Sequence, residues 1–355
     1  MIRFLFKVTC FHRILFAEIC FLAVQTRPSK EKGKNVLKSY FIYIIYCFLF
    51  PSVCVTVIYI PLMLLGLLGN ILTILVVWLR PHMRTSTYLY LSSMAVSDLL
   101  ILLLLPLDLY KLWRPRPWPL GDLVCKLTMF LSECCTFCTI LHITFLSLER
   151  YLAVCWPITA KTLVTRRRTR VLIGCLWLGA ALSAAPVLVM VGVEDVGGED
   201  NVDSSECRCT QYAASSGLLS AMMILSNLYF LVPFCILGLV YSLIGRTLWL
   251  RPQSNRKDQS NKNTVKMLGV IVLAFVFCWL PFHGTDHLYF LYYLSQYFNL
   301  VSSVLFYLSA AINPLLYNLM SGRYRLAVRS LIQPESPFQI HRTRTFTIQQ
   351  ASTTV

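Results

Sequence analysis

The sequence predicts an all-α membrane protein: a bundle of seven transmembrane helices followed by a short amphipathic eighth helix. Of the 355 residues, 57% are hydrophobic and only 14% are charged, which leaves too little polar surface to cover a soluble domain. The hydrophobic residues also gather in seven separate runs, each as long as the ~20 residues that a helix needs to cross a bilayer. We therefore expect lipid to be the main solvent of this protein.

Short charged segments separate the seven runs, and no internal repeat is visible. The runs cover residues 51–79, 86–113, 123–154, 171–191, 212–245, 266–291 and 296–320. We expect residues 51–320 to form the membrane domain, 321–333 an amphipathic helix at the membrane surface, and 334–355 a disordered cytoplasmic tail. Three interpretations of residues 1–50 stay open: a cleaved signal peptide, an extra membrane segment, and an artefact of gene assembly.

The charge pattern predicts how the chain crosses the membrane. A net charge of +16 would suggest nucleic-acid binding in a soluble protein, but here Lys and Arg lie in short segments between apolar runs, as they do in cytoplasmic loops. The segment between the fourth and fifth runs is acidic instead, from Glu194 to Glu206. We expect a multi-pass plasma-membrane protein with an extracellular N-terminus, a cytoplasmic C-terminus, lipid contacts and no nucleic-acid partner.

Polar residues inside the predicted spans are functional candidates, because a charge within a bilayer is costly. Asp98 lies in the middle of the second span, and Asn70, Ser309 and Asn313 lie in other spans at positions that could complete a hydrated cluster around it. Oxygen ligands suit a sodium ion, which is the one candidate cofactor. The alternative is a structural hydrogen-bond network without an ion.

The cytoplasmic end of the third span carries the triplet Glu149-Arg150-Tyr151. A local ion pair can restrain Arg150, and its release would create a two-state element of the kind that signalling requires. Such a triplet also occurs by chance at helix ends.

Prolines inside the sixth and seventh spans predict kinks, because each removes a backbone hydrogen bond. They lie in Trp279-Leu280-Pro281 and in Asn313-Pro314-Leu315-Leu316-Tyr317. Each motif alone is ordinary in membrane helices. Their occurrence together with the Glu-Arg-Tyr triplet, each on the appropriate span, is not.

These motifs together resemble the rhodopsin-like class of G-protein-coupled receptors over about residues 60–333. The resemblance rests on Gly69-Asn70, Leu91 with Asp98, Cys125, Glu149-Arg150-Tyr151, Trp177, Pro233, Trp279 with Pro281, and Asn313-Pro314-Tyr317. Within that class the chain is similar to the ghrelin and motilin receptor group, through PLDLYKLW at 106–113, RPW at 116–118, SLIGRTLW at 242–249 and FCWLPFH at 277–283. More stretches resemble the motilin branch, whereas SAAIN at 309–313 resembles the ghrelin branch.

The resemblance implies a receptor, not an enzyme, for a gut or endocrine peptide hormone. It implies coupling to a heterotrimeric G protein of the Gq class, with phospholipase C and calcium signalling, and arrestin binding after phosphorylation of the tail. Arg150 would contact the G protein, supported by Tyr241 and Tyr317. It also implies a disulfide between Cys125 and Cys207, because Cys207 follows an acid as in the family's Glu-Cys-Arg stretch; Cys209 is the competing partner.

The outer halves of the spans predict an acidic ligand pocket, formed by Asp108, Glu133, Trp279, Phe282, His283, Asp286 and Phe306. An acidic pocket attracts a peptide with a basic group or a free amine. Asp286 stands where the family has an arginine, so the family's pair with Glu133 is absent. The alternative places Asp286 in solvent at the outer loops. His283 and His287 share a helical face, but we expect them to pack or to line the pocket and predict no metal site.

Other classes of membrane protein fit the sequence less well. A transporter is the main alternative, but it would show inverted repeats and broken half-helices in matching positions. An opsin needs a lysine in the seventh span, and residues 297–320 contain none. A membrane enzyme would need a catalytic motif, and no Ser/His/Asp or His/Glu arrangement is visible.

Overall fold

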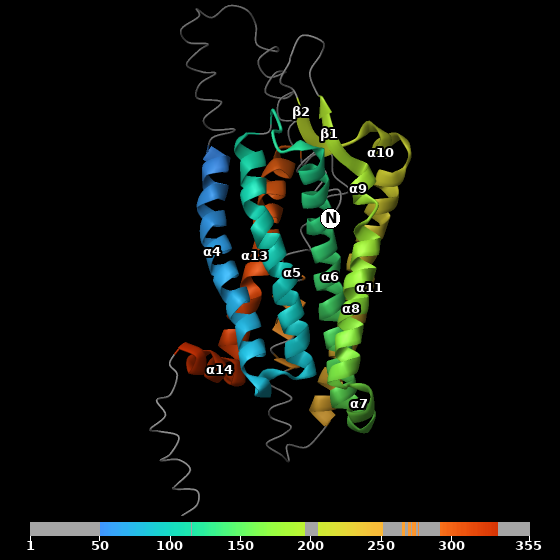
Figure 1. Cartoon of the computed structure of the whole chain (residues 1–355). Helices are drawn as coiled ribbons and strands as arrows, with labels where there is room; N and C mark the ends of the chain where they lie inside the picture. The colour runs from blue at the N-terminus through green and yellow to red at the C-terminus, as the bar shows by residue number, and fades with distance from the viewer. Residues whose placement is uncertain are drawn as a thin grey trace, which may run out of the picture.

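The computed structural model describes residues 50–114, 116–195, 205–250 and 292–332, together with eight residues between 265 and 276. Its long helices run side by side, with a small β-hairpin at one end of the bundle and a short helix lying across the other (Figure 1). Residues 1–49, the tail after 332 and most of the predicted sixth span, including Trp279, Phe282, His283 and Asp286, lie outside the described residues. The predictions made for them stay predictions.

Six of the predicted spans correspond to long helices. These are α4 (Phe50–Leu79), α5 (Ser86–Trp113), α6 (Gly121–Cys155), α8 (Arg166–Ala184), α11 (Leu218–Leu250) and α13 (Tyr292–Met320). In the described part of the chain, five helices are long and apolar enough to cross a membrane by themselves, and the apolar part of α13, Val301–Tyr317, passes the same test together with α14 (Gly322–Ile332). The bend between these two is 88°, so α14 turns away from the bundle as the predicted amphipathic helix should.

Several span boundaries differ from the prediction by a few residues, and the starts of the fourth and fifth spans differ for local reasons. The fourth helix begins at Arg166 rather than 171, because the hydroxyl of Thr165 accepts a hydrogen bond from the backbone N–H of Arg168 and caps a helix that continues through the arginines. The predicted fifth span, 212–245, is divided. The short helix α10 (Gln211–Ser215) precedes α11, and Gly217 between them has φ +75°, a conformation that glycine adopts without strain.

The sequence analysis missed the β-hairpin that follows the fourth span. After the short helix α9 (Val187–Met190), strand β1 (Val191–Asp195) pairs antiparallel with β2 (Ser205–Cys209), and Val193 lies opposite Cys207. The prediction for this segment rests on its acidic charge, and charge carries no information about strand pairing. The membrane bundle itself is α-helical as predicted, and the hairpin is an addition outside it.

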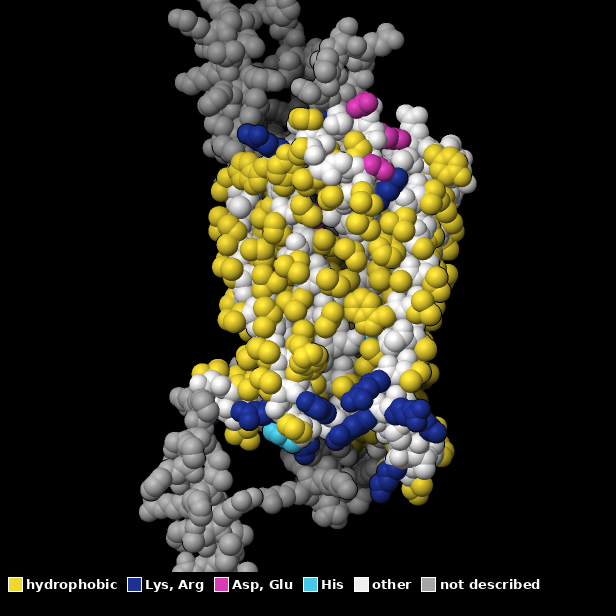
Figure 2. Space-filling model, in the orientation of Figure 1, with side chains coloured by type: hydrophobic (Ala, Val, Ile, Leu, Met, Phe, Trp, Pro, Cys, Tyr) yellow, Lys and Arg dark blue, Asp and Glu magenta, His cyan; other side chains and the backbone are white. Residues whose placement is uncertain are grey.

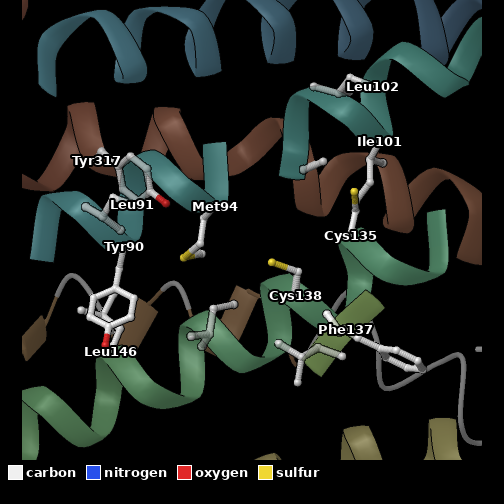
Figure 3. Close-up of a cluster of buried hydrophobic side chains, with 14 of the residues drawn as sticks. Tyr90, Leu91, Met94, Ile101, Leu102, Cys135, Phe137, Cys138, Leu146 and Tyr317 are labelled. Carbon is white, nitrogen blue, oxygen red and sulfur yellow. The ribbon is translucent and has the colours of Figure 1, made fainter. Parts of the chain in front are cut away.

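Helix α6 lies at the centre of the bundle. In its most apolar stretch 72% of the residues are buried, against 22–50% for the other four spanning helices. Figure 3 shows side chains from α5 and α6, among them Met94 and Cys138, meeting in the buried cluster around it. The outer surface of the bundle is instead a broad apolar belt (Figure 2), which lipid would cover.

Close helix packing fixes α4 and α14 to the rest of the bundle. A Cβ atom at Gly69 would lie 2.8 Å from Cβ of Pro314 in α13, so glycine allows the two helices to touch here. One turn further along α4, the hydroxyl groups of Thr73 and Tyr324 are 2.9 Å apart. Arg80 also donates a hydrogen bond of 2.5 Å to the carbonyl oxygen of Ser330. These polar contacts hold α14 against the end of α4.

Candidate functional site

The outer half of α6 carries a buried carboxylate. Glu133 is 1% exposed, and neither of its carboxylate oxygens has a hydrogen-bond partner among the described residues. A buried ionised group without a partner is costly. Glu133 is therefore suited to a cationic partner that comes from outside the described part of the chain.

Asp108, the second predicted acid, has a different environment. The phenol group of Tyr307 in α13 donates a hydrogen bond to the Asp108 carboxylate. The ring of Tyr307 lies edge-on to that of Tyr59 in α4, with centroids 5.0 Å apart, and to that of Phe306, with centroids 5.1 Å apart. Through Tyr307, Asp108 thus links three helices, whereas Glu133 has no partner among the described residues.

The structure brings part of the predicted pocket together. Phe306 is buried and lies beside the tyrosine that binds Asp108. The sequence analysis missed Tyr59 and Tyr307, although a tyrosine in the seventh span at the level of an acid in the second was a usable signal. The pocket wall predicted from the sixth span lies in the undescribed segment.

The predicted disulfide is confirmed. Cys125 at the outer end of α6 is bonded to Cys207 in β2, with their Cα atoms 5.7 Å apart. Cys209, the alternative partner, lies opposite Val191 in the hairpin register and is not part of this disulfide. The bond fixes the hairpin to the outer end of α6.

Polar contacts fix the hairpin further. Nη2 of Arg116 lies 2.8 Å from Oε2 of Glu206, whose side chain is 5% exposed. The backbone N–H of Trp118 donates to the carbonyl oxygen of Ser205 at 2.9 Å, and the backbone N–H of Val193 donates to the Asp122 carboxylate at 3.0 Å. The hairpin is thus held at a defined place over the outer end of the bundle, as Figure 1 shows.

The predicted sodium cluster forms only in part. Nδ2 of Asn313 donates to the buried Asp98 carboxylate at 2.9 Å. Asn70 instead donates to the carbonyl oxygens of Gly66 and Ala310, and its own Oδ1 is buried without a hydrogen-bond partner among the described residues. The Ser309 hydroxyl group donates to the carbonyl oxygen of Phe306 rather than to Asp98. The Asp98 carboxylate and the Asn70 oxygen are ligands of the type that sodium prefers, so the ion stays a proposal.

Near the C-terminal end of α6 the predicted acid–arginine pair is present. Nη2 of Arg150 lies 2.9 Å from Oε1 of Glu149, and both side chains are largely buried. Tyr151 packs against the apolar cluster formed by α6 and α11. The hydroxyl group of Tyr241 is 3.4 Å from that of Ser147.

Tyr317 and Pro314 lie in the inner half of α13, as predicted. The hydroxyl group of Tyr317 is buried and has no hydrogen-bond partner among the described residues, while its ring lies edge-on to Tyr324 of α14 at 6.2 Å. Tyr317 therefore has, near the C-terminal end of α13, a hydroxyl group that no described residue binds.

The sequence analysis missed two hydroxyl groups that form a short hydrogen-bond chain to Glu149. The Ser86 hydroxyl group donates to Oε2 of Glu149 at 2.9 Å and lies 2.5 Å from that of Thr169. Both residues lie at helix ends close to basic loops, where the hydrophobic pattern says nothing about which hydroxyl groups point inward.

The fold and these features define a class of protein, and sequence comparison agrees. Residues 69–317 match the family model described as 7 transmembrane receptor (rhodopsin family). The chain belongs to this family. It is a multi-pass plasma-membrane receptor with a seven-helix bundle, and it is not an enzyme.

Individual relatives place the chain within the family. It is 51% identical to growth hormone secretagogue receptor type 1 of Sus scrofa over 293 residues, covering 78% of this chain and 80% of the relative. It is 42% identical to the motilin receptor of Homo sapiens, covering 82% and 84%, and 31% identical to neurotensin receptor type 1 of Rattus norvegicus, covering 83% and 79%. The predicted likeness to the ghrelin and motilin receptor group is confirmed. The stretches that favour the motilin branch do not decide between the branches, because identity to the secretagogue receptor is higher.

The disulfide can be tested by peptide mapping of the unreduced protein. Trypsin cleaves after Arg208 and so separates Cys207 from Cys209. We expect the peptide that contains Cys125 to be crosslinked to the one that ends at Arg208, and the crosslink to persist in a Cys209→Ser variant. A crosslink between Cys125 and the peptide that begins at Cys209 would contradict the structure.

Proposed function

We propose that this receptor binds a peptide hormone, as the named relatives of the ghrelin and motilin group do, and that a basic group or free amine of the peptide pairs with Glu133. Binding would occur on the extracellular side, and signalling would proceed through a G protein of the Gq class to phospholipase C and calcium. The observation that carries the proposal is the buried, unpartnered carboxylate of Glu133. The high identity to peptide receptors supports the class of ligand.

Electrostatics supports a cationic ligand. A carboxylate in a site with little water gains more from an ammonium or guanidinium group than it would in solution, and the hydrogen bonds between such groups are short and strong. Asp286 stands where an arginine is expected from the family resemblance, so the chain itself supplies a second acid rather than a cation. Two neighbouring carboxylates repel each other unless a cation lies between them.

The contrast between the two described acids supports Glu133 rather than Asp108 as the first contact. Asp108 already accepts a hydrogen bond from Tyr307, so a ligand would have to replace that bond. Glu133 has no such bond to lose in the described part of the chain. We therefore assign Asp108 to the edge of the pocket.

The charge distribution supports the proposed orientation. Lys and Arg gather at the end of the bundle that carries α14, and the visible acidic side chains gather around the hairpin at the other end (Figure 2). Cytoplasmic loops are enriched in Lys and Arg. The end with α14 would then face the cytoplasm, and the disulfide-bonded hairpin would face the oxidising exterior.

On the cytoplasmic side, Arg150 would contact the G protein in the active state. Its pairing with Glu149 supports a resting form that must open first. As the sixth helix swings outward, Tyr241 and the unused hydroxyl group of Tyr317 would move to support the released arginine. Phosphorylation of the Thr- and Ser-rich tail after residue 342 would then recruit arrestin.

The ligand contact can be tested with the receptor's activating peptide, identified from a panel of gut peptides by calcium release. Glu133→Gln keeps the size of the side chain and removes its charge, so it should weaken activation by a basic peptide about ten- to a hundredfold, as expected for a lost charge-assisted hydrogen bond. Ser132→Ala, one residue along the same helix, is the matched control.

Asp286→Arg should raise the response to the usual peptides of the group. Dose–response curves unchanged by both Glu133→Gln and Asp286→Arg would remove both residues from the site.

The coupling role of Arg150 can be tested by Arg150→Ala. We expect this variant to lose G-protein signalling while surface expression and peptide binding persist, because the arginine acts on the cytoplasmic partner and not on the ligand. Arg168→Ala is the matched control, since Arg168 lies on the same side of the membrane and, within the described part of the chain, its side chain donates to the Thr162 carbonyl oxygen. Undiminished signalling by Arg150→Ala would contradict the mechanism.

A further inference from the structure

The Glu149 carboxylate has two sets of partners on its two oxygens. Oε1 accepts from Arg150 at 2.9 Å, and Oε2 accepts from the Ser86 hydroxyl group at 2.9 Å. The Ser86 oxygen is in turn 2.5 Å from the hydroxyl oxygen of Thr169. Ser86 is the first residue of α5 and Thr169 lies in the first turns of α8, so three helices meet at one carboxylate.

The direction of these hydrogen bonds follows from the chemistry of the groups. An ionised carboxylate only accepts, so Ser86 must give its single proton to Glu149. The Ser86 oxygen is then an acceptor, and the proton between the two hydroxyl groups must come from Thr169. The result is a chain from Thr169 through Ser86 to Glu149, in which each bond polarises and strengthens the next.

The hydrogen bonds from Thr169 through Ser86 to Glu149 are important because these side chains have little contact with water. Glu149 is 7% exposed and Thr169 is 3% exposed, so water has little access to the oxygen that Ser86 contacts. Without the hydroxyl groups Oε2 would lack these bonds, and the carboxylate would gain by turning toward solvent. That turn would also pull Oε1 away from Arg150.

In the described part of the chain, Arg150 forms a single ion pair, and its partner is Glu149. The predicted loop between the fifth and sixth spans and the start of the sixth span offer few substitutes. Between Arg246 and Val276 it contains one acid, Asp258, among several basic residues. The restraint on Arg150 therefore depends strongly on where the Glu149 carboxylate is held.

We propose that Ser86 and Thr169 are positioning residues that keep the Glu149 carboxylate on Arg150 and thereby set the receptor's signalling in the absence of ligand. The inference rests on the proposed role of Arg150 in coupling. Loss of either hydroxyl group weakens the restraint and shifts the resting equilibrium toward the active form. Ser86 touches the carboxylate directly, so its loss has the larger effect.

The test measures agonist-free recruitment of engineered Gα subunits from each major class to the full-length receptor at matched surface expression. We expect Ser86→Ala to raise recruitment about two- to tenfold and Thr169→Val to raise it less, as the loss of one bond to a buried charge implies. Ser86→Thr and Thr169→Ser, which keep a hydroxyl group, should restore the wild-type level. Thr162→Val is the control, because that hydroxyl group donates only to the Thr159 carbonyl oxygen.

A double-mutant cycle separates positioning from a general loss of stability. In a Glu149→Gln background, Ser86→Ala should add no further recruitment, because the group that it positions is already altered. Unchanged or lower recruitment by Ser86→Ala, or an additive effect on Glu149→Gln, would overturn the proposal. A fully coupling Arg150→Ala variant would contradict the proposed function itself. An Arg150→Ala variant that uncouples, together with a Ser86→Ala variant that has no effect, would contradict only the positioning role of Ser86.

Discussion

The exclusion of water from around α6 is the constraint on which the other features depend. Along most of its length this helix is enclosed by its neighbours, so each buried charge on it needs a partner inside the protein or from a ligand. Near its C-terminal end, Glu149 has such partners in Arg150 and Ser86. In its outer half Glu133 has none among the described residues. Among the described residues, this helix therefore carries an acid with partners near its C-terminal end and, in its N-terminal half, a buried acid without one.

Under the proposed function, Asp108 and Glu133 have different roles: Asp108 helps to hold the bundle, and Glu133 binds the ligand. Asp108 binds Tyr307 and joins α5 to α13, so its charge is used within the protein. The hairpin is attached to α6 by the Cys125–Cys207 disulfide and to the preceding loop by Arg116. These contacts hold the hairpin end of the bundle in one arrangement, which under the proposed function preorganises the site around Glu133.

Much of the fold could be predicted from the sequence because the bilayer imposes a simple length rule. The second span was predicted as 86–113, and the helix is Ser86–Trp113. The β-hairpin was missed because strand pairing in a short loop leaves no periodic signal. In the site, Glu149-Arg150 was visible as a motif, whereas Ser86 and Thr169 were not. Their role depends on three helices meeting at one point, and only the packed bundle reveals that.

The central claim is that ligand binding satisfies Glu133 and that activation releases Arg150. An experimentally determined structure of the receptor bound to an activating peptide and a G protein tests both parts in one measurement. The account predicts a cationic nitrogen of the peptide within about 3 Å of the Glu133 carboxylate, with Arg150 turned from Glu149 toward the G protein. A Glu133 carboxylate that contacts no ligand cation, together with an Arg150 that is still paired to Glu149, would contradict it.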